Sequence, residues 1–156
     1  MTDVILCGET LTIDSKFSHI SLIQPNTSNY TLGQQIGWAI QQRPRLILVQ
    51  TMPTNRIEWI DESTKLISMP IAEIMTAAEP HSKKSMISNY CTGILDPEVK
   101  HLYDMGLLQM WAQRAKYANV KTLFVLDKES EFLIPFLDEY LVEGDINDRL
   151  QAMLCE

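Results

Sequence analysis

The chain has 156 residues, of which 46% are hydrophobic and 21% are charged, and its formal net charge is −7. This length suits one domain with a single core, and the composition is that of a globular rather than a disordered protein. No apolar run approaches the roughly 18 residues of a membrane span, and the first residues do not resemble a secretion signal, so we expect a cytoplasmic protein.

The amino-terminal part of the chain predicts extended structure. Val4 begins a short apolar run, and Leu11 and Ile13 alternate with polar neighbours as they would on a half-buried edge strand. A second extended segment covers 18–24, and the stretch 24–31 after it is a polar loop rich in turn-forming residues.

A helix is predicted from a cap at Ser28 or Thr31 up to Pro44, whose ring disfavours helical geometry at the residue before it. Gly33 and Gly37 lie one turn apart in this helix, and each costs on the order of 1 kcal/mol in a helix interior. A close approach must offset that cost, and we favour packing against the sheet backbone over contact with a ligand.

The middle of the chain predicts alternating strands and helices. The segment 45–51 is a continuous apolar run, which is typical of a central parallel strand buried on both faces. A short helix within 52–64 is predicted next, followed by a strand over 65–70 and a helix that begins at Pro70. The segment 81–93 fits either helix or loop.

The clearest helix signals come at 96–119, where Asp96 is a cap, Pro97 takes the first helical position and Glu98 lies in the first turn. The spacing of apolar residues predicts one buried side for this helix. That predicted side consists of Val99, Leu102, Tyr103, Leu107, Met110, Trp111 and Ala115.

The carboxyl-terminal part predicts a strand over 120–127, a helix over 128–144 that Pro135 interrupts, and an amphipathic helix over 146–156. Strands that alternate with helices imply a mostly parallel sheet with helices on both faces. The predicted fold is therefore a three-layer α/β/α sandwich that forms one domain over 1–156.

The excess negative charge lies in residues 127–156, which we call the acidic C-terminal section. It contains nine acidic and two basic residues, so the remaining residues are balanced. Such a section repels nucleic-acid phosphates and favours a protein partner with a basic surface, although a solvated helix face is an alternative interpretation. No direct nucleic-acid or membrane contact is expected. The predicted partner-binding residues are Trp59, Glu139, Glu143, Asp145 and Asp148.

Trp59 belongs to this set because tryptophan is enriched in interface hot spots, and burial in the core is its alternative role. The weak catalytic candidates are Glu9, Asp127 and Glu129, which follow predicted strands. Carboxylates that meet at the carboxyl edge of a parallel sheet can hold Mg²⁺ for a hydrolytic or phosphoryl-transfer reaction. Asp127 is also well placed to cap the next helix, and we favour that role.

Sequence motifs for common cofactors and nucleophiles are absent: there is no G-x-G-x-x-G, no phosphate-binding G-x-x-x-x-G-K-[ST] loop and no G-x-S-x-G. The three cysteines lack the spacing of a zinc or redox motif, and the pairing of Cys91 with His81 or His101 as a catalytic base has little support. No metal site or cofactor is expected. The sequence predicts a non-enzymatic binding or regulatory protein, such as an accessory subunit, inhibitor or immunity-type protein. The alternative is a small Mg²⁺-dependent hydrolase or phosphotransfer enzyme.

Overall fold

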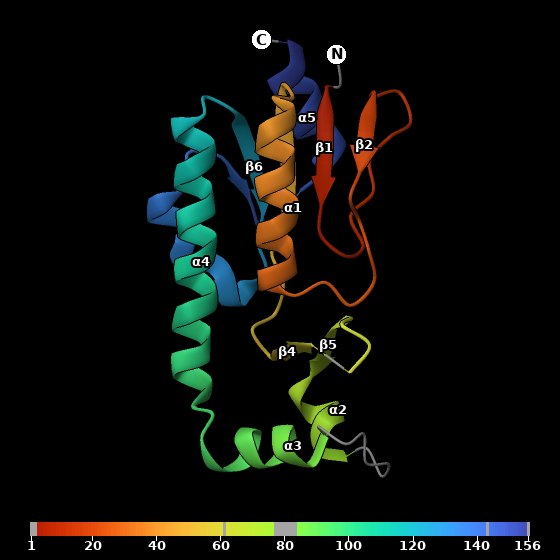
Figure 1. The fold of residues 1–156 in the computed structure, drawn as a ribbon. Coiled ribbons are helices and arrows are strands. Elements are labelled where there is room, and N and C mark those ends of the chain that lie inside the picture. The colour runs from red at the N-terminus through yellow and green to blue at the C-terminus, as the bar shows by residue number, and fades with distance from the viewer. Residues whose placement is uncertain (1–2, 61, 77–83, 143, 156) are drawn as a thin grey trace.

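A five-stranded parallel sheet is the centre of the fold (Figure 1). A computed structural model describes residues 3–60, 62–76, 84–142 and 144–155. The strands of the sheet lie in the order β2 (His19–Ser21), β1 (Val4–Cys7), β3 (Leu46–Gln50), β6 (Lys121–Val125) and β7 (Tyr140–Leu141). All neighbouring strands in it run in parallel.

Helices cover both faces of this sheet, with α1 (Asn29–Gln42) and α4 (Pro97–Tyr117) on one face and α5 (Ile146–Cys155) on the other. The predicted α/β sandwich with a mostly parallel sheet is confirmed. Within the described residues, no helix combines the length and apolarity needed to cross a membrane.

A small insertion lies beyond the carboxyl edge of the sheet, between β3 and α4 (Figure 1). It contains an antiparallel hairpin and two short helices. These elements are β4 (Arg56–Ile60), β5 (Leu66–Pro70), α2 (Ile71–Thr76) and α3 (Lys84–Gly93).

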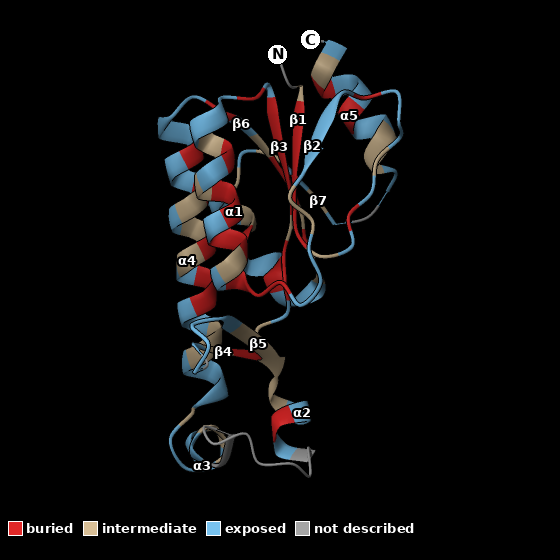
Figure 2. Cartoon of the chain, turned by 45° about the vertical axis from the view of Figure 1, so that its right-hand side comes forward, coloured by how far each residue is buried: buried red, intermediate tan, exposed pale blue. Residues whose placement is uncertain are grey.

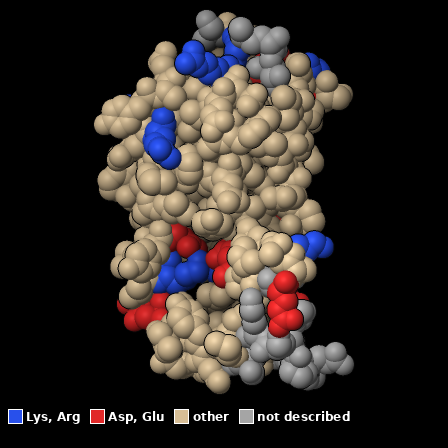
Figure 3. All heavy atoms as spheres, in the orientation of Figure 1, with Lys and Arg blue, Asp and Glu red and all other residues tan. Residues whose placement is uncertain are grey.

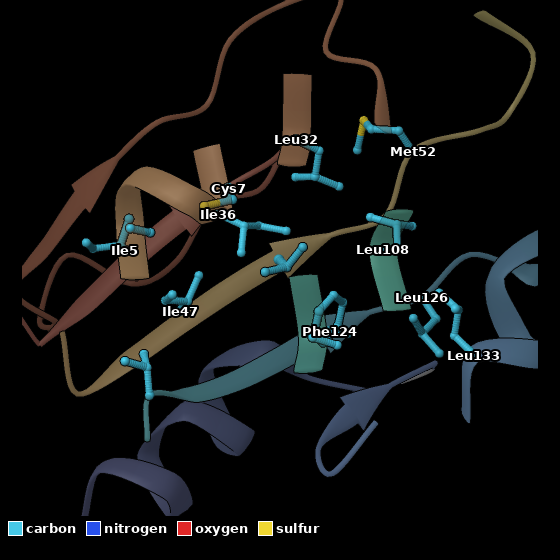
Figure 4. Packing of buried hydrophobic residues seen from close by; sticks show 14 of the residues in the cluster. Ile5, Cys7, Leu32, Ile36, Ile47, Met52, Leu108, Phe124, Leu126 and Leu133 are labelled. Carbon is cyan, nitrogen blue, oxygen red and sulfur yellow. The ribbon is translucent and has the colours of Figure 1, made fainter. Parts of the chain in front are cut away.

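Alternating side chains of the buried strands divide the core into two layers. Ile5 and Ile47 pack toward α1 and α4, whereas Val4 and Leu46 pack toward α5. Figure 4 shows the first of these layers, in which Phe124 of β6 also lies. The central strands β1 and β3 are buried along their length in Figure 2, as their continuous apolar runs predict.

The two glycines of α1 make room for the indole of Trp111 on α4. A Cβ built on Gly37 would lie 2.7 Å from Cη2 of Trp111, and one built on Gly33 would overlap Nε1 of the same ring. The cap of α1 is Ser28, one of the two predicted residues. The predicted close approach therefore exists, but the partner is a helix side chain and not the sheet backbone.

The buried side predicted for α4 is largely wrong. Its buried residues are Asp104, Met105, Leu108, Ala112 and Ala115, while Val99, Leu102, Tyr103 and Met110 are exposed. The helix has apolar side chains on two faces, so periodicity alone does not identify the one that packs on the core. Met105, Leu108 and Ala112 pack into the core, whereas the exposed apolar side chains lie on another face of the helix.

Two predicted helices take other conformations. The segment 56–60 is the strand β4, in which Ile57 and Trp59 alternate with polar residues. The predicted helix over 128–144 is a 3-10 helix, η1 (Lys128–Phe136), followed by the short strand β7. The edge strand predicted around Leu11 is also absent, because that segment is a loop.

Candidate protein-binding site

The carboxyl edge of the parallel sheet is the first place to look for a ligand site. The chain adds β2 on one side of β1 and then β3 on the other, so the strand order reverses between β1 and β3. Ligands of such sheets bind in the crevice at this reversal. Glu9 and Asp127 follow the ends of β1 and β6 at this edge, and Gln50 is the last residue of β3.

The side chain of Gln50 fills the space between the ends of β1 and β3. Its Oε1 accepts hydrogen bonds from the N–H groups of Glu9 at 3.2 Å and Thr10 at 3.0 Å, and its Nε2 donates to Thr10 Oγ1 at 3.0 Å. Gly8, at φ +145, allows this approach, because a Cβ there would lie 2.8 Å from Gln50 Cβ. Backbone donors that would face a ligand in this crevice are thus bound by the protein itself.

The candidate catalytic carboxylates have separate structural roles at this edge. Glu9 accepts the N–H of Asn26 at 2.8 Å, and Asp127 accepts the N–H of Ser130 at 2.9 Å as the cap of η1. Glu129 is exposed on η1. Among the described residues, no group of three or more His, Cys, Asp and Glu side chains is arranged to hold a metal ion.

A buried polar network holds the insertion against the two helices. The carboxylate of Asp104 on α4 accepts both Lys100 Nζ, at 2.6 Å, and Asn29 Nδ2, at 3.3 Å. Asn29 also exchanges two hydrogen bonds with the backbone of Met52, at 2.9 and 3.2 Å. Sequence reasoning missed this network because Asn29 comes from a helix distant in the sequence from Lys100 and Asp104, which lie one turn apart on α4.

The helix η1 is fixed against α4 close to this network. The ring of Phe132 contacts the imidazole of His101, with 5.2 Å between ring centroids, and His101 Nδ1 lies 3.3 Å from Thr54 Oγ1. Leu133 of η1 is fully buried in the core. The position of η1 is therefore set by its contact with α4 and by the burial of Leu133 in the core.

Several acids of the acidic C-terminal section are engaged in contacts within the chain. Asp138 pairs with Lys116 of α4 at 2.8 Å, and Glu139 pairs with Arg149 of α5. Asp145 accepts the N–H of Asn147 at the start of α5, and Asp148 is exposed there. Two of the predicted partner-binding acids thus have structural contacts, and Glu143 lies outside the described residues.

Exposed aromatic rings accompany the acids on η1. Phe132 is 40% exposed and Phe136 is 50% exposed, although both are large apolar side chains. Glu129 and Glu131 beside them are exposed as well. Glu129 and Phe132 are three residues apart and therefore share one face of the 3-10 helix. The sequence predicted a helix over 128–144 and did not identify these aromatic residues as exposed.

Trp59, the predicted partner anchor, is half-buried on β4. It lines an open, largely apolar pocket of about 470 Å³ together with Met86, Ile87 and Tyr90 of α3. Its position fits neither full core burial nor free exposure. Whether a partner contacts it stays a prediction.

The three cysteines have different surroundings. Cys7 is buried in the core, and desolvation raises the pKa of its thiol to about 12. Cys91 on α3 is half-buried, and burial raises the pKa of its thiol as well, which disfavours the reactive thiolate. Cys155 is exposed at the end of α5. All three thiols are free, as expected, but only Cys7 is buried.

No family model matches this chain, and no curated protein or solved structure shows significant similarity to it. The functional conclusion therefore depends on the geometry of the fold.

Proposed function

We propose that this chain is a non-enzymatic binding or regulatory protein that engages a basic protein partner through its acidic C-terminal section, with η1 as the central contact. The observation that carries the proposal is the exposure of Phe132 and Phe136 beside the exposed carboxylates of Glu129 and Glu131. Aromatic anchors surrounded by charged residues are the usual composition of an interface hot spot.

The chemistry of η1 defines the partner. Apolar side chains of the partner would pack on the two phenylalanine rings, and lysine or arginine side chains would pair with the two glutamates. Lys128, also exposed on η1, reduces the local negative charge by one. Since rim charges act mainly on the rate of association, binding should weaken as salt concentration rises.

The carboxyl edge of the sheet supports a binding role more than catalysis. Gln50 occupies the crevice, and Glu9 and Asp127 are each committed to a backbone N–H group. These contacts stabilise loops and helix starts, for which no substrate is needed.

Selection from a random peptide-display library tests this proposal with a defined probe. We expect wild-type protein to enrich peptides that combine lysine or arginine with apolar residues. The variant Phe132→Ala/Phe136→Ala should lose most of the binding, and Glu129→Lys/Glu131→Lys should remove the preference for basic residues. Circular dichroism verifies that each variant is folded.

The matched control is Asp148→Lys, which changes the net charge by the same amount as Glu129→Lys alone but alters α5 instead of η1. If that control loses binding while the η1 variants keep it, the contact lies on α5 and the proposal for η1 is wrong. Selected peptides without basic residues, or no enrichment at all, would refute the basic partner.

A further inference from the structure

The outward face of α4 carries apolar side chains that no other element of the described chain covers. Leu102 is 67% exposed, Tyr103 75% and Tyr117 89%. Val99 and Met110 are also exposed on this helix. Figure 2 shows that the outer side of α4 is largely exposed along its length. We call Val99, Leu102, Tyr103, Gly106, Met110 and Tyr117 the α4 seam.

The spacing of the seam is that of a helix that pairs with another helix. Val99, Tyr103, Gly106, Met110 and Tyr117 follow one another at intervals of three, four or seven residues, which is a heptad pattern. At 100° per residue, these positions lie opposite Asp104, Leu108 and Ala115, which face the core. The seam is therefore a second contact face on a helix whose first face is already packed.

Gly106 lies at the middle of the seam and of the helix. A Cβ built there would meet nothing within 4 Å, so no contact with the described residues accounts for a glycine at this position. An exposed interior glycine destabilises a helix by about 1 kcal/mol relative to alanine. A glycine at such a position lets the backbone of a second helix approach closely.

The charges at the ends of α4 select the orientation of that second helix. Asp96 and Glu98 lie at its amino end, and Arg114 and Lys116 lie at its carboxyl end. An antiparallel copy of α4 that crosses at Gly106 places the acidic end of each helix beside the basic end of the other. Glu98 and Lys116 lie on one flank of the seam, where Lys116 also pairs with Asp138 of its own chain. Asp96 and Arg114 lie on the other flank, where Asp96 also caps α4.

We propose that two copies of this chain associate through their α4 seams as an antiparallel, two-fold symmetric helix pair that crosses at Gly106. Leu102 and Met110 lie four residues before and after Gly106. In this pair, Leu102 of one copy packs against Met110 of the second copy. Figure 3 shows that the face over α1 and α4 is largely uncharged, which suits an apolar contact. The contact is isologous and closes as a dimer without exposing further edges.

Sedimentation velocity of the full chain measures this association from low micromolar to sub-millimolar concentrations. We expect a monomer–dimer equilibrium, and Tyr103→Glu should shift the protein to monomer over that whole range. The same change on the outward face of another helix, Trp38→Glu on α1, should leave the dimer intact. A monomer at every concentration would overturn the proposal, as would loss of the dimer in the Trp38→Glu control only.

Disulfide cross-linking tests the two-fold axis directly. In a Cys155→Ser background, Gly106→Cys should form an intermolecular disulfide on mild oxidation because each residue 106 faces its own copy. Gln113→Cys lies two turns away on the same face and should not, because it faces Val99 of the other copy. Cross-linking of Gln113→Cys equal to that of Gly106→Cys would show a parallel pair and refute this arrangement.

A charge exchange tests the flanks. Glu98→Lys alone should raise the dimer dissociation constant by about tenfold, since a rim pair becomes repulsive. The double variant Glu98→Lys/Lys116→Glu should recover most of the lost dimer affinity. No recovery in the double variant would contradict the proposed pairing.

Discussion

The three glycines in helix interiors form a matched set that tests the packing of α1 on α4. The Trp111 ring covers Gly33 and Gly37 of α1. A Cβ built on Gly106 of α4 would contact none of the described residues. Changing glycine to alanine in a helix interior stabilises it by about 1 kcal/mol through backbone entropy. Any difference among the three variants therefore reports what the new methyl group contacts.

The size of the effect follows from the geometry around Trp111. The methyl group of Gly37→Ala would lie 2.7 Å from Cη2 and 3.0 Å from Cζ3, atoms of a rigid ring that cannot move alone. Overpacking of this kind costs about 1–3 kcal/mol, and the helical gain offsets about 1 kcal/mol of it. We expect Gly37→Ala to lower the free energy of unfolding by about 0–2 kcal/mol, instead of raising it as alanine does in an open helix. Gly33→Ala should lose somewhat more because its contact with the ring is closer.

Urea unfolding at low micromolar protein, followed by circular dichroism, measures these differences. Gly106→Ala should raise the free energy of unfolding by about 1 kcal/mol under the same conditions. In a Trp111→Leu background, Gly33→Ala should become neutral or stabilising, because the two residues are coupled. If Gly33→Ala stabilises the wild-type background as Gly106→Ala does, the proposed role of the indole is wrong.

Further predictions concern the buried polar network and the thiols. Asp104→Ala leaves the Lys100 ammonium without its partner and should cost about 3 kcal/mol in urea unfolding, whereas an apolar replacement of both residues should cost much less. The raised pKa of Cys7 means that the unfolded thiol loses its proton first as pH rises above 9.0, so stability falls between pH 9.0 and about 12. From about pH 8 to about pH 10, wild type should lose about 1.4 kcal/mol more than Cys7→Ala, and an equal loss would contradict this account. Cys155 should react with a thiol reagent at once, and Cys7 only after unfolding.

Features of the fold that depend on neighbouring residues could be predicted from the sequence. The buried strand β3 was recognisable because its apolar run leaves no polar face. The start of α4 was recognisable because Asp96 and Pro97 act through local geometry, and Asp96 does accept the N–H groups of Glu98 and Val99. These signals need no knowledge of the tertiary structure.

Features that depend on tertiary contacts could not be predicted. The strand β4 is stabilised by its pairing with β5, which overrides a sequence that can also form a helix. The packed face of α4 contains Asp104. Its carboxylate can be buried there because Asn29 of α1 and Lys100 of α4 both donate hydrogen bonds to it. The acidic C-terminal section appeared as one feature in the sequence, whereas Asp138 and Glu139 pair with basic residues of α4 and α5 in the structure.

The candidate site was only partly predictable for the same reason. The section that carries the excess charge was identified, and it includes η1, but the aromatic residues of η1 were not among the predicted partner-binding residues. A 3-10 helix with three residues per turn presents different side chains to solvent than an α-helix does. Exposure of Phe132 and Phe136 follows from that difference in period and from the end of the helix at Phe136.

Nuclear magnetic resonance titration of the chain with a selected basic peptide tests the central claim most directly. Our account predicts that amide shift changes concentrate on η1 and on the part of α4 around His101 that it contacts. Changes centred on the carboxyl edge near Gln50, or on α5 near Asp148, would contradict it.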